Sequence, residues 1–238
     1  MSDDYENLIN NLISDGYLKT PSIIEAFKKI DRADFVLDEY KEKAYLNEPL
    51  SIGFEQTISQ PLIVAFMLEL LQPREGEKVL EIGAGSGWQT AIIAEMVGRV
   101  TPNLAEQNAS TQPEEKTREE NVTNQIFGKI IAIERISELK DLSEKNILKY
   151  NFIEKNVANV ILGDGSKGYK NEAPYDRIIA AAAVSGEIPS AWKRQLKIGG
   201  RIVAPFENSV VVIDKVSKNK YVKKDYFGFS FVPLVLRS

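Results

Sequence analysis

The chain has 238 residues, of which 43% are hydrophobic, so it can bury a sizeable core and global disorder is excluded. Its 30 basic and 34 acidic residues give a net charge of −4, which provides no general attraction for nucleic-acid phosphates or anionic membranes. Because cysteine and histidine are both absent, thiol nucleophiles, disulfides, histidine-based triads and Cys/His zinc sites are excluded as well.

No targeting or membrane-spanning segment is predicted. Residues 1–6 are acidic and lack the basic and apolar regions of a secretory signal. The longest apolar run, residues 178–184, is far shorter than the roughly 20 residues that cross a bilayer. We therefore expect a cytoplasmic protein with no membrane partner and no nucleic-acid partner.

Helical spacing of apolar residues predicts three helices in the first third of the chain. They cover residues 5–18, residues 22–31 and, after Pro61, residues up to about 72. Residues 34–50 have a mixed pattern without a clear element. These predicted helices precede all of the predicted strands.

The rest of the chain alternates short apolar runs with helical stretches, which is typical of βαβ units. The predicted helices are 89–96, 136–150 and one that contains Trp192 and Leu196 and ends at Gly199. The predicted strands are 78–83, 130–134, 157–162, 175–181 and 201–205, followed by antiparallel strands at 210–216, 221–226 and 229–236. This order predicts an α/β fold with a doubly wound, mostly parallel sheet, an antiparallel C-terminal edge and extra N-terminal helices.

One polar segment interrupts the pattern. Residues 101–127 hold almost no apolar side chains and no glycine, so we expect an inserted surface loop, with a functional lid as the alternative. We expect a single domain over 1–238. It divides into N-terminal helices and a loop at 1–61, an α/β core at 62–100 and 128–238, and the insertion at 101–127.

Glycines alternate where the strand at 78–83 turns into a helix, in the run from Val79 to Gly87. Glycine is needed where the backbone approaches a ligand closely or has positive φ. A dinucleotide fingerprint requires another glycine at position 88, which is Trp88, and no Lys-Ser or Lys-Thr pair follows to make a phosphate-binding loop. A nicotinamide cofactor and a P-loop are therefore disfavoured.

What remains is a Glu-x-Gly-x-Gly-x-Gly turn, which resembles the first motif of class I S-adenosylmethionine-dependent methyltransferases. The resemblance implies a Rossmann-like fold that binds S-adenosylmethionine and releases S-adenosylhomocysteine. Glu134 ends the second strand of the core, where it could accept the ribose hydroxyls, and Asp164 follows the third, where it could accept the adenine amino group. Glu81 would orient the turn or attract the ammonium group of the cofactor through water. The implied cofactor-binding residues are Glu81, Gly83, Gly85, Gly87, Glu134, Asp164 and Gly165.

A more specific resemblance begins at residues 49–61, with the run Gly-Phe-Glu-Gln-Thr-Ile-Ser-Gln-Pro at 53–61. This run is similar to the signature of protein-L-isoaspartate O-methyltransferases. Residues 23–36, with Asp31-Arg32, are similar to the N-terminal helix of the family and the step after it, and further matches follow in family order at residues 163–165, 173–176, 188–189, 195–196, 199–200 and 231–234. The family methylates the carboxylate of L-isoaspartyl, and in some cases D-aspartyl, residues in damaged proteins and so begins their repair. By this resemblance Ser59 and Thr57 are catalytic and Ile58, Gln60, Val232 and Pro233 bind substrate. No metal is expected, isoaspartyl proteins are the implied partners, and a monomer is expected.

Alternatives remain at the acceptor side. Without histidine, Ser59 cannot be a triad nucleophile; it can orient the accepting carboxylate, or Thr57 and Ser59 can cap the helix after Pro61. Glu55 lies inside this acceptor loop and conflicts with a carboxylate acceptor, because its own carboxylate, if it pointed at the acceptor, would repel the acceptor's negative charge. Either Glu55 points outward or the acceptor is another carboxylate or a modified peptide. A non-catalytic interaction module of the same fold is the remaining reading.

Overall fold

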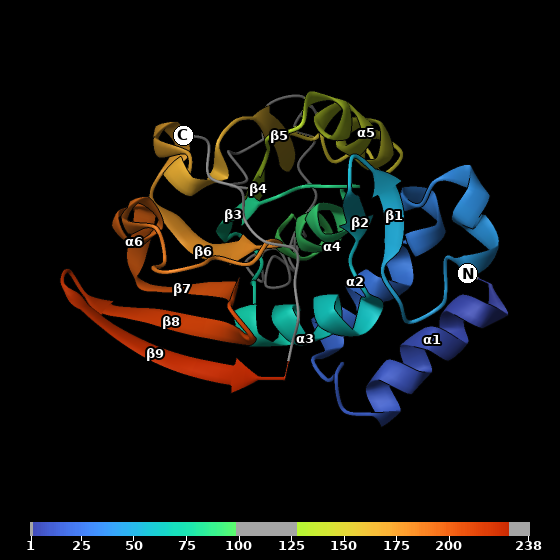
Figure 1. Cartoon of the computed structure of the whole chain (residues 1–238), viewed down its shortest axis with the longest axis horizontal. Coiled ribbons are helices and arrows are strands. Elements are labelled where there is room, and N and C mark those ends of the chain that lie inside the picture. The colour runs from blue at the N-terminus through green and yellow to red at the C-terminus, as the bar shows by residue number, and fades with distance from the viewer. Residues whose placement is uncertain (1, 99–127, 229–238) are drawn as a thin grey trace, which may run out of the picture.

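The computed structural model describes residues 2–98 and 128–228 (Figure 1). The predicted insertion at 101–127 and the predicted strand at 229–236, with Val232 and Pro233, lie outside the described residues. Two described glycines flank the insertion. Gly98 follows the helix after the glycine turn, and Gly128 precedes the next strand. No described helix is long and apolar enough to traverse a bilayer.

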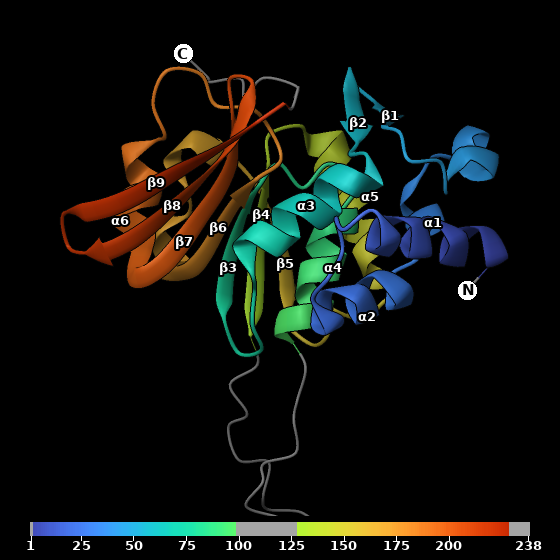
Figure 2. The same cartoon turned by 90° about the horizontal axis from the view of Figure 1, so that it is seen from below.

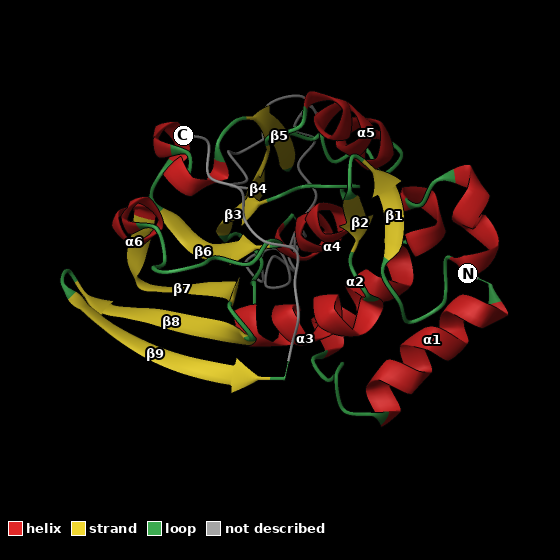
Figure 3. Ribbon diagram, in the orientation of Figure 1, coloured by secondary structure: helices red, strands yellow, loops and turns green. Residues whose placement is uncertain are grey.

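A seven-stranded sheet forms the centre of the structure (Figure 3). Its strands, in the order β5-β4-β3-β6-β7-β8-β9, are parallel from β5 to β7, and β8 and β9 are antiparallel. The bounds are β3 Lys78–Ile82, β4 Lys129–Glu134, β5 Ala158–Leu162, β6 Tyr175–Ala180, β7 Leu196–Phe206, β8 Ser209–Ser217 and β9 Lys220–Phe227. The predicted doubly wound sheet with an antiparallel C-terminal edge is confirmed.

Helices cover both faces of this sheet (Figure 2). The helices α3 (Pro61–Leu71), α4 (Trp88–Val97) and α5 (Ser137–Leu148) lie on one face, and α6 (Ser190–Gln195) lies on the other. Successive strand residues alternate between the two apolar cores, so that Val79 belongs to the first and Leu80 to the second. This two-sided burial explains why the strands read as continuous apolar runs.

The N-terminal segment adds an outer layer against α3 and α4. It contains α1 (Asp3–Ser14), α2 (Pro21–Lys29) and the 3-10 helices η1 (Arg32–Phe35) and η2 (Asp38–Lys43). The buried Tyr5 hydroxyl lies within hydrogen-bond distance of the carbonyl oxygens of Phe27 (2.8 Å) and Ile30 (2.7 Å), between which it shares its one proton, and so ties α1 to the end of α2. The predicted extra N-terminal helices are confirmed, with α1 ending four residues before the predicted boundary.

Two local features differ from the sequence-based expectations. Residues 50–58 form a hairpin of β1 (Leu50–Gly53) and β2 (Gln56–Ile58), which the mixed pattern of this region did not predict. The helix predicted to include Leu196 and to end at Gly199 instead ends at Gln195. Leu196 begins β7 because it pairs with Tyr175 of the neighbouring β6, so a long-range contact decides this boundary.

Short 3-10 helices complete the described elements. They are η4 (Gly165–Lys167) and η5 (Lys170–Glu172), which follow β5 and lead back to β6. Together with the turn after β3 and the end of β4, η4 lies at the carboxyl ends of the parallel strands, the edge at which open α/β sheets bind ligands.

Candidate active site

A cavity of about 460 Å³ lies at the carboxyl ends of the central strands, between the β1–β2 hairpin and the glycine turn. This volume is within the range of about 300–1,000 Å³ that is typical of small-molecule sites. Of the predicted site residues, those that line it are Thr57, Ile58, Ser59, Gln60, Glu81, Gly83, Gly85 and Glu134. Residues far apart in the sequence thus meet at one place, with the predicted acceptor residues on one wall and predicted cofactor residues on the other.

The glycine turn adopts a backbone that side chains rarely allow. Gly83, Gly85 and Gly87 have φ values of 90°, 55° and 88°. Gly85 and Gly83 line the cavity, whereas Gly87 is the N-cap of α4 and packs against α5. A Cβ at Gly87 would lie 2.7 Å from Ser143 Oγ, so this glycine serves helix packing rather than approach to the cavity.

Glu134 holds the turn in place. Its Oε2 accepts a hydrogen bond from the N–H of Gly85 (3.0 Å), and its Oε1 accepts from the N–H groups of Arg135 (2.8 Å) and Ile136 (3.0 Å). Each carboxylate oxygen has two lone pairs, so Oε2 retains capacity for a further donor. A carboxylate that is 5% exposed and lines the cavity suits recognition of hydroxyl groups.

Glu81 is a fully buried carboxyl group below the turn. Its Oε1 accepts from Gln89 Nε2 (2.9 Å) and its Oε2 accepts from Thr90 Oγ1 (2.5 Å), both on α4. Burial raises the pKa of Glu81 to about 7, while these two hydrogen bonds lower it and the charge of Glu134 raises it. The side chain thus joins β3 to α4 and places a titratable group at the wall of the cavity.

On the opposite wall, β2 presents Thr57 and Ser59 follows it. The capping alternative is not what the structure shows, because Gln60 is the N-cap of α3 and makes no side-chain capping bond. Asn47 serves the helix start instead: its Oδ1 accepts from the N–H of Leu62 (3.0 Å), and its carbonyl accepts from Gln60 Nε2 (2.9 Å). Ser59, which lines the cavity, is therefore not engaged in capping α3.

Glu55 lies at the tip of the β1–β2 hairpin. It and Phe54 both have positive φ, as the two central residues of a tight hairpin turn do, and both side chains are exposed. Glu55 is not among the cavity-lining residues, whereas its neighbour Gln56 is. Glu55 therefore points away from the cavity, and its carboxylate is not placed to repel an acceptor carboxylate there.

Asp164 and Gly165 lie just after β5, outside the lining of this cavity. Asp164 caps η4: its Oδ1 accepts from the N–H (3.0 Å) and Oγ (2.7 Å) of Ser166, and Lys167 Nζ lies 3.4 Å from its Oδ2. Burial raises the pKa of Asp164, but the bonds from Ser166 and Lys167 outweigh it, so the net shift is downward. A Cβ at Gly165 would lie 2.4 Å from Ile82 Cγ2, which shows how closely this turn packs on β3.

The cavity is also lined by residues for which the sequence predicted no functional role. Gln89 and Trp88 come from the first turn of α4, Leu139 from α5, and Ala181 and Ala182 from the chain after β6. Ala181 and Ala182 had a usable signal, because they follow a strand that neighbours β3 and so must end at the same edge. Leu139 had none, since its helical pattern marks it only as a core residue.

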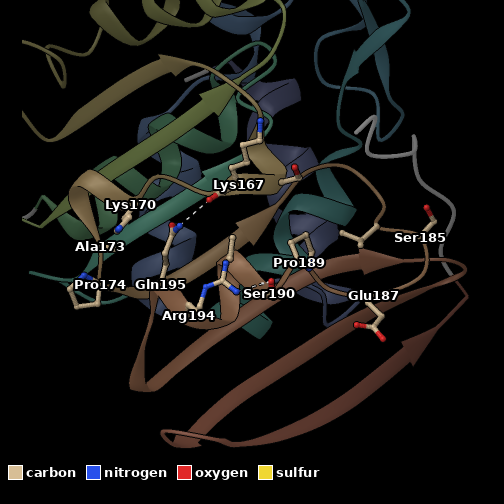
Figure 4. Close-up of a pocket in the computed structure, with 13 residues that line it drawn as sticks. Lys167, Lys170, Ala173, Pro174, Ser185, Glu187, Pro189, Ser190, Arg194 and Gln195 are labelled. Atoms are coloured by element: carbon tan, nitrogen blue, oxygen red, sulfur yellow. Dashed lines mark hydrogen bonds between the residues drawn. The ribbon is translucent and has the colours of Figure 1, made fainter. Parts of the chain in front are cut away.

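A second and larger cavity, of about 970 Å³, lies on the α6 face between η4, η5 and α6 (Figure 4). Gln195 joins its walls: the side-chain amide donates to the carbonyl of Lys167 (2.9 Å), and the side-chain oxygen accepts from the N–H of Tyr169 (2.9 Å). Arg194 donates to Ser190 Oγ at 2.8 Å. None of the predicted site residues in the described ranges lines this cavity, so the candidate active site is the smaller one.

Comparison with known proteins finds relatives along nearly the whole chain. Residues 3–238 match the sequence model of protein-L-isoaspartate(D-aspartate) O-methyltransferases. The protein-L-isoaspartate O-methyltransferase of Staphylothermus marinus is 38% identical over 224 residues, which cover 92% of this chain and 88% of the relative. The enzyme of the same name from Ignicoccus hospitalis is also 38% identical and covers 99% of both chains.

The fold has a counterpart among solved structures. A Plasmodium falciparum chain described as a protein-L-isoaspartate O-methyltransferase, in complex with S-adenosyl-L-homocysteine, superimposes with a TM-score of 0.76. It is 22% identical, and the alignment covers 98% of this chain and 99% of the other. At this identity the likeness concerns the fold.

Proposed function

Because this chain belongs to the protein-L-isoaspartate(D-aspartate) O-methyltransferase family, we propose that its 460 Å³ cavity is where a methyl group passes from S-adenosylmethionine to an isoaspartyl carboxylate. The protein is an S-adenosylmethionine-dependent methyltransferase, in agreement with the family and its full-length relatives. One observation carries the assignment of the cavity: Ser59 and the glycine turn, which are 24 residues or more apart in the sequence, line the same space.

The wall formed by the glycine turn fits the cofactor. Gly85 lines the cavity with a backbone φ of 55°, and an added Cβ there would be in contact with Ile52 Cδ1 at 3.5 Å, so the glycine keeps this part of the wall free of a side chain. Glu134 would accept the ribose hydroxyls, and Asp164 would accept the adenine amino group beside the close-packed Gly165. Glu81 is a carboxyl group near the place where a cationic donor would lie, and its ionised form, which prevails above a pKa of about 7, favours binding of that donor. When bound, the cofactor supplies an activated methyl group on a positively charged sulfur.

The opposite wall fits an acceptor. The Ser59 hydroxyl can donate a hydrogen bond to a carboxylate oxygen and so fix its direction, and Thr57 offers a second hydroxyl on the same segment. Ile58 is 3% exposed and gives the wall an apolar base, while Gln60 is held by Asn47. Val232 and Pro233 stay predictions, because they lie outside the described residues.

This reaction needs no general base. The acceptor carboxylate has an ordinary pKa near 4 and is already ionised at neutral pH. Transfer of a methyl group from a cation to an anion neutralises both charges, so water, which stabilises the separated charges, slows the reaction. The contribution of this chain is therefore to align the acceptor oxygen and to exclude water, which a protein without cysteine and histidine can do.

A methyl-transfer assay with labelled S-adenosylmethionine tests the proposal. We expect label in a peptide with an L-isoaspartyl residue and none above background in the same peptide with a normal aspartyl residue. Equal labelling of the two peptides, or labelling only of an unrelated carboxylic acid, would reject isoaspartyl selectivity.

The substitution Ser59→Ala tests the acceptor wall. It removes one hydrogen bond to a charged oxygen, a bond worth roughly 1.5–3 kcal/mol, so kcat/KM for the isoaspartyl peptide should fall by about ten- to a hundredfold. The dissociation constant of S-adenosylhomocysteine, measured by calorimetry, should change little because Ser59 is on the other wall.

Asp164→Ala is the reciprocal variant. It should weaken S-adenosylhomocysteine binding by about tenfold, the effect of one charge-assisted hydrogen bond, and leave the KM of the peptide nearly unchanged at saturating donor. If Ser59→Ala weakened donor binding as much as Asp164→Ala does, the division of the cavity into two walls would be wrong.

A further inference from the structure

Arg32, in η1, is a fully buried cation directly behind the acceptor wall. Its Nη1 donates to the carbonyl oxygens of Ala44 (2.7 Å) and Leu46 (3.2 Å). Its Nη2 donates to those of Glu48 (2.9 Å) and Ser59 (3.1 Å). The guanidinium thus binds carbonyl groups both before and after the β1–β2 hairpin and links these two segments of the chain.

The same guanidinium contacts the start of the cofactor side. Its central carbon lies 5.4 Å from the centroid of the Trp88 ring, a cation–π distance. Trp88 begins α4 directly after the glycine turn, and its indole N–H donates to the carbonyl of Ile30 at 3.3 Å. Arg32 therefore lies between the residue that carries the acceptor-side hydroxyl and the first residue of the cofactor-side helix.

Stability alone does not account for a cation here. Burying a charge costs free energy that carbonyl dipoles offset only in part, and Arg32 Nε has no hydrogen-bond partner among the described residues. Burial lowers the pKa of Arg32 to about 10, while Tyr5 and Glu48 raise it, so the group keeps its charge at neutral pH. A rigid planar fork that directs several donors at fixed angles is what arginine offers and lysine does not.

We propose that Arg32 is a positioning residue for the acceptor: it holds the Ser59 carbonyl, and so keeps the Ser59 hydroxyl at the cavity and in register with the glycine turn through Trp88. The inference rests on the proposed role of Ser59. Arg32 itself does not line the cavity, so it acts through Ser59 and not on the substrate.

Arg32→Lys is the first variant, because lysine keeps the positive charge but cannot serve these carbonyls as a fork. We expect kcat/KM for the isoaspartyl peptide to fall by about tenfold or more, since small displacements of a positioning group cost that much. The dissociation constant of S-adenosylhomocysteine should stay within about twofold of the original value. Arg32→Gln takes its place if the lysine variant does not fold.

Arg177→Lys is the matched control. Arg177 is also mostly buried, donates from Nε to the carbonyl of Gln72 (3.4 Å) and pairs with Glu77 (2.9 Å), but neither of these two partners lines the cavity, unlike Ser59 and Trp88 beside Arg32. The Arg177→Lys variant should have a lower midpoint of thermal unfolding and an unchanged KM for the peptide. If both variants changed activity only in proportion to their loss of stability, Arg32 would be merely structural and the inference would fail.

A double-mutant cycle with Ser59→Ala gives the decisive measurement. If Arg32 acts through Ser59, Arg32→Lys should have little further effect on acceptor kcat/KM once the hydroxyl is gone. Fully multiplicative effects would overturn the inference, as would unchanged acceptor kinetics in Arg32→Lys alone. The result is distinguishable from failure of the proposed function, which would appear as an inactive wild-type protein or as a Ser59→Ala variant with normal kinetics.

Discussion

At the scale of single residues, Glu81 is a carboxyl group whose protonation depends strongly on its surroundings. It is fully buried, and its hydrogen-bond partners come from the side chains of Gln89 and Thr90. Its pKa rises from an ordinary value of 4.5 to about 7 because burial penalises the charged form. Between these two values the folded protein holds a proton that the unfolded chain has released.

The free energy of unfolding should therefore fall as pH rises through this window, and Glu81→Gln should remove that dependence. By linkage the difference between wild type and variant should change by roughly 3 kcal/mol between about pH 4.5 and above pH 7. Urea unfolding at several pH values measures it. Glu138→Gln, on the exposed side of α5, is the control and should keep the wild-type dependence; a Glu81→Gln curve parallel to wild type would contradict the prediction.

At the scale of elements, the glycine turn has two tasks, which different glycines perform. Gly83 and Gly85 line the cavity, whereas Gly87 lets α4 start close to α5. Asn146 of α5 supports the same turn, since its side-chain amide donates to the carbonyl of Ser86 at 3.0 Å. Two side chains therefore hold the turn by hydrogen bonds, Asn146 of α5 at Ser86 and Glu134 of β4 at Gly85.

Gly87→Ala should destabilise the fold more than Gly76→Ala does. Both glycines have positive φ, which costs an alanine about 1–2 kcal/mol. An added Cβ at Gly76 has no atom within 4 Å, whereas at Gly87 it meets Ser143 Oγ at 2.7 Å and the Ser143 carbonyl at 3.1 Å. Overpacking should add about 1–3 kcal/mol at Gly87 alone, measurable by urea unfolding. Equal losses in the two variants would show that α5 moves away without cost.

At the scale of the whole molecule, the cavity exists only where two layers meet. One wall comes from the N-terminal part, residues 49–64, and the other from the α/β core, including Glu81, Glu134 and Ala181. Lys29 of α2 pairs with Glu95 of α4 at 2.7 Å, and the Phe27 and Trp88 rings meet edge to face at 5.6 Å. These contacts hold the layers together, so ligand binding at their junction should stabilise the whole fold.

S-adenosylhomocysteine at about 100 times its dissociation constant should raise the free energy of unfolding by about 2.7 kcal/mol, because it binds only the folded state. Thermal unfolding with and without the ligand measures this. Ser59→Ala should show the full increase and Asp164→Ala a smaller one at the same ligand concentration. A full increase in Asp164→Ala would remove Asp164 from the cofactor site.

The sequence by itself determined the order of helices and strands in the core and the edge of the sheet at which the candidate site lies. Apolar periodicity and the glycine run are local signals, and parallel strands joined by helices must place their carboxyl ends together. The run at 53–61 likewise indicated the proposed acceptor segment through its family resemblance. For these reasons the fold class, the cofactor and the reaction could be predicted before any coordinates.

Only the tertiary structure decided the features that depend on contacts between distant residues. Leu196 became a strand residue through pairing with Tyr175. The N–H of Leu62 at the start of α3 donates to Asn47 Oδ1, and not to the hydroxyl of Thr57 or Ser59. Arg32 lies in a stretch, residues 23–36, that is similar to the family, but no local pattern indicated its role, because its partners are backbone carbonyls up to 27 residues away and carbonyls look alike in every sequence. Such contacts form when the layers pack, so no local pattern can encode them.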